Sequence, residues 1–335
     1  MRPRGTMRAP DFWQHDGALA RLLTPLGLAW QLAGAARRAF ARPLRAAVPV
    51  ICVGNLVAGG AGKTPVVLAL LVLLTERGLK PAALTRGYGG NRPGPLPVDP
   101  GRHDAAMVGD EALLLAAAAP TWLARDRVDG AREAIDEGAE ILVMDDGFQN
   151  PRLKKDLSLL VIDAGYGLGN GRVMPAGPLR ESPASGFARA DAVVLIGDGP
   201  IGTITRQLPP GLLVLRARLE PRGRSLAGRR VYAFAGIGRP QKFFDSLRGL
   251  GAELVGCETF ADHQPYDAAT LERLAAAAAA AGAQLVTTAK DAARLGRAAP
   301  PGLAVLDVAL VWEDKNALLR LLERLPLPPP RTPTR

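Results

Sequence analysis

A glycine-rich turn between an apolar segment and an apolar helix limits the folds open to this chain more than any other feature. The apolar segment 48–53 predicts a buried strand, and the turn that follows, 54–62, contains four glycines. Gly62-Lys63-Thr64 then opens an apolar stretch that predicts a helix over 63–77. This strand–turn–helix context is typical of a phosphate-binding loop, or P-loop, which binds a nucleoside triphosphate.

In a P-loop the glycines let backbone N–H groups approach phosphate oxygens, and the helix N-terminus adds a partial positive charge. Lys63 is expected to reach the β- and γ-phosphates of ATP, and the Thr64 hydroxyl is expected to bind Mg²⁺. Val57 departs from the strict pattern, which has glycine at this position. The predicted nucleotide-binding residues are Val57, Ala58, Gly59, Gly60, Ala61, Gly62, Lys63 and Thr64.

Two adjacent carboxylates follow another apolar segment, 140–144, which runs into Asp145 and Asp146. In P-loop proteins such a strand lies beside the P-loop strand, and an aspartate at its end helps to hold Mg²⁺. The alternative is a strand end capped by two solvated aspartates. The pattern therefore predicts Asp145 and Asp146, together with Thr64, as candidate metal ligands.

Strands and helices alternate along most of the chain. The segments that predict strands are 48–53, 82–85, 121–124, 140–144, 157–162, 192–196, 231–235, 253–256, 284–287 and 304–308. This alternation predicts an α/β fold with a parallel sheet that helices cover on both faces. We expect a P-loop NTPase-like domain over 46–217, a smaller α/β domain over 218–326 and a disordered, proline-rich tail over 327–335.

The N-terminal region, 1–45, combines apolar residues at helical spacing with a basic cluster. An apolar stripe beside arginines is typical of an amphipathic helix in the interface of an anionic membrane. The alternative is a helix that packs on its own domain. The uncharged stretch 22–36 contains a proline and is too short to span a bilayer. The apolar residues are Leu19, Leu22, Leu23, Leu26, Trp30 and Ala33, and the basic ones are Arg37, Arg38, Arg42 and Arg45.

The formal net charge of +10 suits an anionic membrane surface, a phosphorylated substrate or a nucleic acid. The basic residues are scattered and lack interleaved aromatic residues, so a nucleic-acid partner has little support. The two cysteines, Cys52 and Cys257, are too few for a disulfide framework and are consistent with a reducing compartment.

Seven further segments are not explained by ATP binding alone. They are Thr-Arg-Gly-Tyr-Gly-Gly at 85–90, Gly-Asp-Glu at 109–111, Asp-Asp-Gly-Phe-Gln at 145–149, Pro-Ala-Gly-Pro-Leu-Arg-Glu at 175–181, Ala-Gly-Ile-Gly at 235–238, Phe-Ala-Asp-His at 260–263 and Thr-Ala-Lys-Asp-Ala at 288–292. With the P-loop, their order and spacing resemble the tetraacyldisaccharide 4′-kinase family of lipid A biosynthesis, from about residue 12 to about residue 325.

The resemblance implies transfer of the γ-phosphate of ATP to the 4′-hydroxyl of a tetraacylated glucosamine disaccharide 1-phosphate, which gives lipid IVA. It also implies two α/β domains with the active site between them and a dependence on Mg²⁺. The N-terminal helix is expected to bind the protein to the cytoplasmic face of the bacterial inner membrane.

The resemblance also assigns an acid–base pair. It places Asp110 in catalysis as the base that accepts the sugar hydroxyl proton, and it pairs His263 with Asp110 across the two domains. The alternatives are that Asp110 only caps the helix that Gly109-Asp110-Glu111 opens, and that His263 is structural. Glu111, Asp145 and Asp146 remain as Mg²⁺ ligands or as acceptors behind the ligands, without a ranking.

Substrate contacts are expected from residues in or beside the family-like segments. The guanidinium group suits phosphate because it donates two parallel hydrogen bonds, although most arginines of such a chain lie on the solvated surface. The candidates are Arg86, Tyr88, Arg127, Gln149 and Arg180. The chain departs from the family at Val57, where Thr or Ser is usual, and at Asn150, where His is common.

Two other functions compete with the kinase. A membrane-associated ATP switch of the partitioning type carries a signature lysine just before the Gly-Gly pair, where this chain has Ala58. That function would also leave Asp262-His263 without a role. A soluble small-molecule kinase would leave the amphipathic N-terminus without a role.

Overall fold

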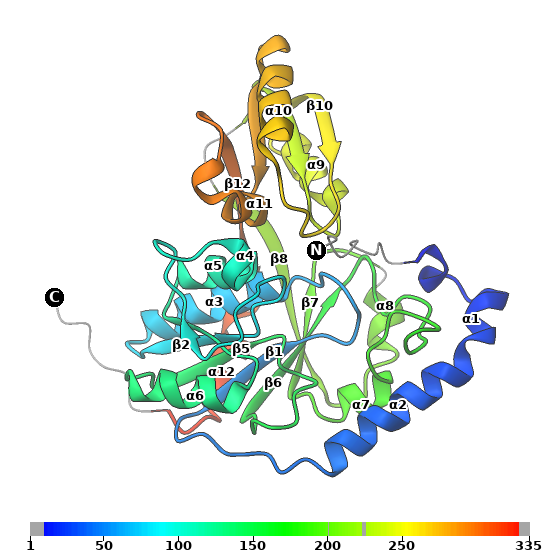
Figure 1. Ribbon diagram of the computed structural model, residues 1–335. Helices are drawn as coiled ribbons and strands as arrows, with labels where there is room; N and C mark the ends of the chain where they lie inside the picture. Colours follow the sequence, from blue (N-terminus) through cyan, green and yellow to red (C-terminus); the bar gives the residue numbers. More distant parts are fainter. Residues whose placement is uncertain (1–9, 200, 223–225, 328–335) are drawn as a thin grey trace.

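The computed structural model describes residues 10–199, 201–222 and 226–327. Over these residues, twelve strands form one sheet in the order β10-β9-β11-β12-β8-β7-β6-β1-β5-β2-β4-β3. Figure 1 shows a broad lower part that contains β1 and a narrower upper part that contains β10. We call residues 46–217 the P-loop half and residues 218–326 the C-terminal half.

The P-loop half contains most of the parallel sheet. Its strands are β1 (Val50–Gly54), β2 (Pro81–Thr85), β3 (Leu96–Pro97), β4 (Thr121–Leu123), β5 (Ile141–Asp145), β6 (Leu157–Asp163) and β7 (Ala192–Ile196). Its helices are α3 (Lys63–Glu76), α4 (Ala105–Val108), α5 (Asp110–Ala116), α6 (Arg127–Asp136), α7 (Pro183–Phe187) and α8 (Ile201–Thr205). All residues of β1, β2, β5, β6 and β7 are buried, which is why these segments are apolar without alternation.

The position of β1 explains how the ends of two strands build one site. β1 pairs in parallel with β5 on one side and with β6 on the other. In this register Val53 lies opposite Asp145, so the turn after β1 and the carboxylates after β5 leave the same edge of the sheet. The carboxyl edge of a parallel sheet is the usual place for a ligand.

The C-terminal half repeats the pattern on a smaller scale. Its strands are β9 (Arg230–Ala235), β10 (Glu253–Thr259), β11 (Gln284–Thr288) and β12 (Ala304–Trp312), with helices α9 (Pro240–Gly249), α10 (Ala268–Ala280), α11 (Ala289–Leu295) and η2 (Gly296–Ala298). β9 pairs in parallel with β10 and β11. Buried side chains such as Val231, Phe244 and Leu247 form a core separate from that of the P-loop half.

Two long strands connect the halves. The sequence analysis did not predict β8 (Leu213–Arg222), and it expected β12 to end near Val308. β8 pairs with β7 through its first part and, antiparallel, with the end of β12 through its second part. The expected boundary near residue 217 therefore lies inside a strand. α12 (Lys315–Leu322) follows β12 in the sequence and packs on the P-loop half, where Leu318, Leu321 and Leu322 join the core.

The N-terminal region consists of η1 (Asp11–Gln14), α1 (Ala18–Leu22) and α2 (Thr24–Ala39). One side of it contacts the P-loop half: a Cβ on Gly27 would lie 2.7 Å from the Val173 carbonyl oxygen, and the Trp30 indole donates to the Arg180 carbonyl at 3.2 Å. Its outer side is apolar. The exposed apolar residues of this region are Leu19, Leu22, Leu26, Leu28, Trp30, Leu32, Phe40 and Leu44.

The basic cluster after α2 is partly used inside the protein. Arg38 lies 3.5 Å from the buried carboxylate of Glu181, and Arg45 lies 3.7 Å from Asp156. Within the described part of the chain, no helix is both long and apolar enough to cross a membrane. The expected disordered tail lies, apart from Leu327, outside the described residues.

Candidate active site

The P-loop lies between β1 and α3, and two of its glycines, Gly59 and Gly60, are open to solvent. A Cβ on Gly59 or Gly60 would meet nothing within 4 Å, so a ligand can approach the backbone there. Gly62 has a left-handed backbone with φ 83°, and a Cβ on it would lie 2.8 Å from Ile196, so this position requires glycine. Lys63 and Thr64 follow as the first two residues of α3.

The structure explains the departure at Val57. This residue forms an antiparallel bridge with Leu179, and the next N–H group, on Ala58, donates to the Pro178 carbonyl at 2.8 Å. An extended, paired backbone needs no glycine. The bridge also brings the family-like segment 175–181 against the P-loop, so that Arg180 lies at the edge of the site.

The three candidate metal-binding carboxylates lie near α3, but their partners differ. Asp146 accepts two hydrogen bonds from the Arg180 guanidinium, at 2.8 and 3.1 Å, and lies 3.7 Å from the Lys63 ammonium. Glu111 lies within hydrogen-bond distance of Lys290 and accepts from the Thr64 hydroxyl at 3.4 Å. The buried Asp145 Oδ1 has no hydrogen-bond partner among the described residues.

The electrostatics of these carboxylates follow from their partners. Burial, with the nearby charge of Glu111, raises the pKa of Asp145 to about 7. Burial would also raise the pKa of Asp146, but the charges of Lys63 and Arg180 outweigh it and lower the pKa. The charges of Lys63 and Lys290 only partly offset this effect, so a divalent ion close to Asp145 would stabilise its charged form.

This arrangement fits a Mg²⁺ ion that protein and nucleotide share. Hard cations prefer oxygen ligands, and Mg²⁺ is usually held by one or two carboxylates together with substrate phosphates. Within the described ranges, no group of three or more His, Cys, Asp or Glu side chains is placed to hold a metal ion. The free oxygen of Asp145 and the hydroxyl of Thr64 are suited to such a shared ion.

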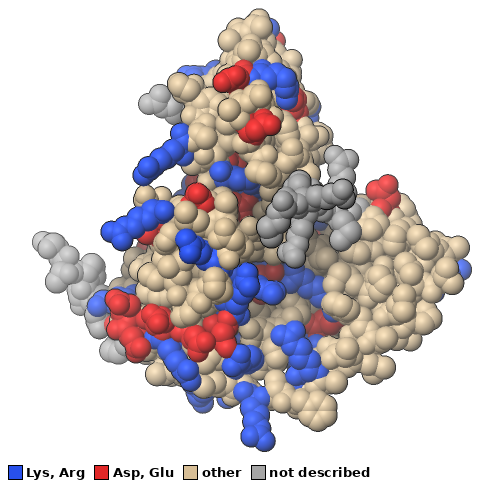
Figure 2. All heavy atoms as spheres, viewed as in Figure 1, with Lys and Arg blue, Asp and Glu red and all other residues tan. Residues whose placement is uncertain are grey.

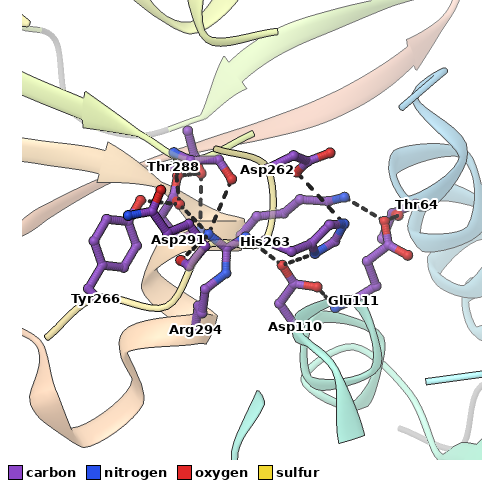
Figure 3. Close-up of polar contacts among 12 residues, drawn as sticks. Thr64, Asp110, Glu111, Asp262, His263, Tyr266, Thr288, Asp291 and Arg294 are labelled. Atoms are coloured by element: carbon purple, nitrogen blue, oxygen red, sulfur yellow. Dashed lines mark hydrogen bonds and ion pairs between the residues drawn. The ribbon is translucent and has the colours of Figure 1, made fainter. Parts of the chain in front are cut away.

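Asp110 and His263, which lie on different halves of the chain, are in contact. The His263 Nδ1 lies 3.1 Å from Asp110 Oδ2, and Glu111 N–H donates to Asp110 Oδ1 at 2.9 Å (Figure 3). Asp110 is the first residue of α5. Its side chain does not cap the helix in the usual way, because its Oδ1 accepts from the N–H group of the adjacent residue, Glu111. The expected pair is thus brought together.

The charges of this pair are strongly perturbed. Burial would raise the pKa of Asp110, but the contacts with His263, Lys290 and Arg294 hold it well below its ordinary value. The hydrogen bond to Asp110 raises the pKa of His263, against its partial burial. The pair therefore favours an ionised carboxylate with the proton on the imidazole.

The backbone of the site is unusual at two positions. Asp146 and His263 have φ of 49° and 59°, and in the described part of the chain they are the non-glycine residues with positive φ. Such backbone conformations cost about 1–3 kcal/mol each and gather at functional sites.

The predicted substrate-binding residues occupy different environments. Arg180 bridges Asp146 and the Gln149 side chain, which lies 3.3 Å away. The exposed Tyr88 ring stands edge-on to the His263 imidazole, with ring centroids 5.3 Å apart. Arg127 is buried against the Ala124 carbonyl, and its Nε has no hydrogen-bond partner among the described residues. Arg86 is exposed, beside Gly87.

Two basic residues to which the sequence pattern assigned no role complete the site. Both come from α11: Lys290 contacts Glu111. Arg294 contacts Asp110 at 2.7 Å (Figure 3). Lys290 belongs to the family-like segment 288–292, which was a usable signal, whereas Arg294 lies two residues beyond the end of that segment. Nothing in the local pattern distinguishes Arg294 from the other arginines of the chain.

Comparison with known proteins gives one consistent result. A family model described as tetraacyldisaccharide-1-P 4′-kinase matches residues 19–326. Proteins named tetraacyldisaccharide 4′-kinase from Paramagnetospirillum magneticum and Rhodospirillum centenum are 54% and 56% identical to this chain, over 95% of it and over 99% and 97% of their own lengths. A crystal structure of LpxK from Aquifex aeolicus in complex with ATP has a TM-score of 0.73 and 27% identity, and covers 91% of this chain and 99% of that one.

The position of Asp145 predicts how stability depends on pH without nucleotide and Mg²⁺. Its folded-state pKa, about 7, lies above the ordinary value of 3.8, so stability falls as pH rises between these values and stays low above them. Asp145→Asn should therefore raise the free energy of unfolding by roughly 2–4 kcal/mol at pH 8. At pH 4 the gain should be small.

Thermal and urea unfolding at pH 4, 6 and 8 measures this effect. Asp129→Asn, on the exposed side of α6, is the matched control and should leave the pH profile unchanged. Parallel profiles for wild type and Asp145→Asn would show that Asp145 carries no unfavourable charge in the folded state.

Proposed function

This chain belongs to the tetraacyldisaccharide-1-P 4′-kinase family, and we propose that the residues around Lys63, Asp110 and His263 carry out the family's reaction. The protein is an ATP-dependent kinase of lipid A biosynthesis. It transfers the γ-phosphate of ATP to the 4′-hydroxyl of tetraacyldisaccharide 1-phosphate and gives lipid IVA and ADP. The observation that carries the site assignment is the contact of Asp110 with His263, next to the P-loop helix.

The P-loop is proposed to hold the triphosphate of ATP. The backbone is open at Gly59 and Gly60, and Lys63 and Thr64 begin α3, so the N–H groups of this loop are suited to phosphate oxygens. The Lys63 ammonium, which lies 3.7 Å from Asp146, would contact the β- and γ-phosphates when the nucleotide binds. Because phosphoryl transfer depends mainly on positioning and on charge neutralisation, this lysine is an essential part of the site.

Asp145 and Thr64 are proposed to hold Mg²⁺ together with the nucleotide. A bound Mg²⁺ neutralises charge on the transferred phosphoryl group. Asp146 is already paired with Arg180 and Lys63, and Glu111 is paired with Lys290, so both are proposed as supporting acceptors. This ranking separates the three carboxylates, for which the sequence analysis left the order open.

Asp110 and His263 are proposed to act as one acid–base unit on the sugar hydroxyl. The sequence analysis expected Asp110 to take the proton and His263 to orient it. In the observed contacts both oxygens of Asp110 already accept hydrogen bonds, and its pKa is lowered. We therefore propose that the proton comes to rest on His263 and that Asp110 fixes the imidazole and stabilises its charge, as carboxylates do in hydrolase triads.

The remaining predicted residues are proposed to bind the disaccharide. Arg180 and Gln149 lie at the P-loop edge, and Tyr88 lies against His263, so the three border the place where a hydroxyl must meet the γ-phosphate. Arg86 follows the end of β2 and Arg127 follows the end of β4, so both lie near the same edge of the sheet. They remain proposed phosphate or sugar contacts. Their guanidinium groups suit an anionic substrate.

The exposed apolar side of α1 and α2 is proposed to lie on the cytoplasmic face of the inner membrane. Leu22 and Leu32 are 75% and 70% exposed, which is costly in water and favourable in a lipid interface. Figure 2 shows that the surface at the right, over these helices, carries few charged side chains. A membrane-bound enzyme also meets a tetraacylated substrate where that substrate resides.

A purified-protein assay tests the function directly. With labelled ATP and lipid A disaccharide 1-phosphate, we expect label at the 4′-position of the product, read by mass spectrometry. Lys63→Ala should abolish transfer while the fold persists, because the phosphates lose their cation. Label at another hydroxyl, or near-normal turnover by a folded Lys63→Ala variant, would refute the assignment.

The acid–base unit predicts non-additive losses. Asp110→Ala and His263→Ala should each lower kcat by about 10²–10⁴-fold, far more than they raise the KM of ATP. The double variant should be little worse than the poorer single variant, because residues that act as a unit are not additive. Multiplicative losses would mean independent roles.

The pH profile separates the two members of the unit. If His263 takes the proton, activity should rise with pH as the imidazole loses its proton at its raised pKa. Asp110→Asn should move this rise to lower pH, because it weakens the hydrogen bond that raises the pKa of His263. If Asp110 is the base, Asp110→Asn should instead remove the rise.

Membrane binding is predicted to depend on the exposed leucines. Replacing Leu22, Leu26 and Leu32 by Ser should weaken cosedimentation with anionic vesicles by at least about tenfold, because a buried leucine contributes about 1.5–3 kcal/mol. Val72→Ser with Val305→Ser, which are also exposed, is the control and should bind as the wild type does. Equal vesicle binding by both variants would mean that these leucines pack on the protein itself and do not enter the membrane.

A further inference from the structure

The Arg294 guanidinium is the most enclosed cation next to the acid–base unit in the described part of the chain. Its side chain is 6% exposed, and it lies between α11, α5 and the end of β9. Nη2 donates to Asp110 Oδ2 at 2.7 Å. Nη1 donates to Asp291 at 3.0 Å, to the Gly236 carbonyl at 3.2 Å and to the Gln264 carbonyl at 3.3 Å. The two nitrogens therefore serve different halves of the chain.

Asp291 fixes this guanidinium from behind. Its carboxylate is fully buried and accepts from the Gly236 N–H, from the Tyr266 hydroxyl at 2.7 Å and from the Thr288 hydroxyl at 2.7 Å (Figure 3). A carboxylate with this many donors has one orientation. Arg294 is thus held in a defined place before it reaches Asp110.

Arg294 also supports the loop that presents His263. It donates to the carbonyl of Gly236, which follows β9, and to the carbonyl of Gln264, the residue after His263. The His263 N–H donates to the same Gly236 carbonyl at 3.3 Å, and His263 has the left-handed φ of 59°. Such a conformation persists only when the surrounding contacts determine it.

We propose that Arg294 is a positioning residue for phosphoryl transfer: it fixes the Asp110 carboxylate and the His263 loop relative to each other when the two halves meet. This inference rests on the proposed function of the Asp110–His263 unit. Arg294 touches neither nucleotide nor sugar in this role, and it acts through the two residues that do the proton transfer.

The geometry requires arginine and not only a positive charge. One planar group reaches Asp110 on one side and Asp291 and two carbonyls on the other, which a single ammonium on a flexible stem does not do. Arg294→Lys therefore keeps the charge beside Asp110 and loses the shared geometry. Arg294→Met loses both and keeps the apolar stem.

The experiment compares these variants in steady-state kinetics with ATP and lipid A disaccharide 1-phosphate. Arg294→Met should lower kcat by about 10²-fold, the loss expected for a misplacement of about 1 Å, with the KM of ATP little changed. Arg294→Lys should fall between Arg294→Met and wild type. In a His263→Ala background, Arg294→Met should add little further loss, because it acts through the same unit.

Arg297→Met is the matched control. Arg297 follows Arg294 by one turn and also reaches across the halves, to the Gly101 carbonyl at 3.3 Å, but it does not contact Asp110. It should retain wild-type kcat. Thermal midpoints of all variants are measured, and if Arg294→Met is unfolded, the comparison of Arg294→Lys with Arg297→Met decides.

Three results would overturn the proposal: wild-type kcat in a folded Arg294→Lys variant, a loss that appears only in the KM of ATP, or an equal loss of kcat in Arg297→Met. An additional, multiplicative loss in the His263→Ala background would also contradict it. Absence of 4′-phosphorylation by the wild type would instead refute the proposed function, so the two failures are distinguishable.

Discussion

The burial of the Asp110 carboxylate is the constraint on which the arrangement of the site depends. This residue is 3% exposed, and a buried charge costs several kcal/mol unless it is paired and hydrogen-bonded. Its charged partners, His263 and Arg294, both come from the C-terminal half. Glu111, the next residue, is compensated in the same way by Lys290. The first two side chains of α5 are therefore neutralised mainly by cations from the C-terminal half, which holds the two halves together there.

The same contacts explain why two strained backbone positions persist. Asp146 is held by Arg180 and Lys63, and His263 is held by Asp110 and the Gly236 carbonyl. Each side chain is fixed from outside its own segment, so relaxation of the backbone would break an ion pair or a hydrogen bond to a buried group. The strain is thus maintained by contacts that are also suited to phosphate binding and proton transfer.

The local sequence pattern was sufficient to predict the P-loop, β1, α3 and the place of Asp145. A strand that is buried on both faces is a continuous apolar run, and the residue at its end lies at the carboxyl edge of the parallel sheet. The segment of β8 escaped prediction because four of its ten residues are exposed and charged residues interrupt its apolar ones. The contact of Asp110 with His263 followed only from the resemblance to the family. Arg294 could not be identified, because its contact with Asp110 joins residues 184 apart in the sequence and the chain has 42 lysines and arginines.

A line of polar contacts joins the N-terminal helix to the phosphate loop. Arg38 on α2 pairs with the buried Glu181, whose other oxygen accepts from the Gln149 amide at 3.1 Å. Gln149 in turn accepts from Arg180, and Arg180 pairs with Asp146 beside Lys63. Trp30 adds a second contact from α2 to the Arg180 carbonyl. The helix with the exposed apolar surface is therefore attached to the same segment, 175–181, that borders the P-loop. In the membrane-bound state proposed above, the orientation of this helix would therefore also set the orientation of the P-loop edge relative to the lipid surface.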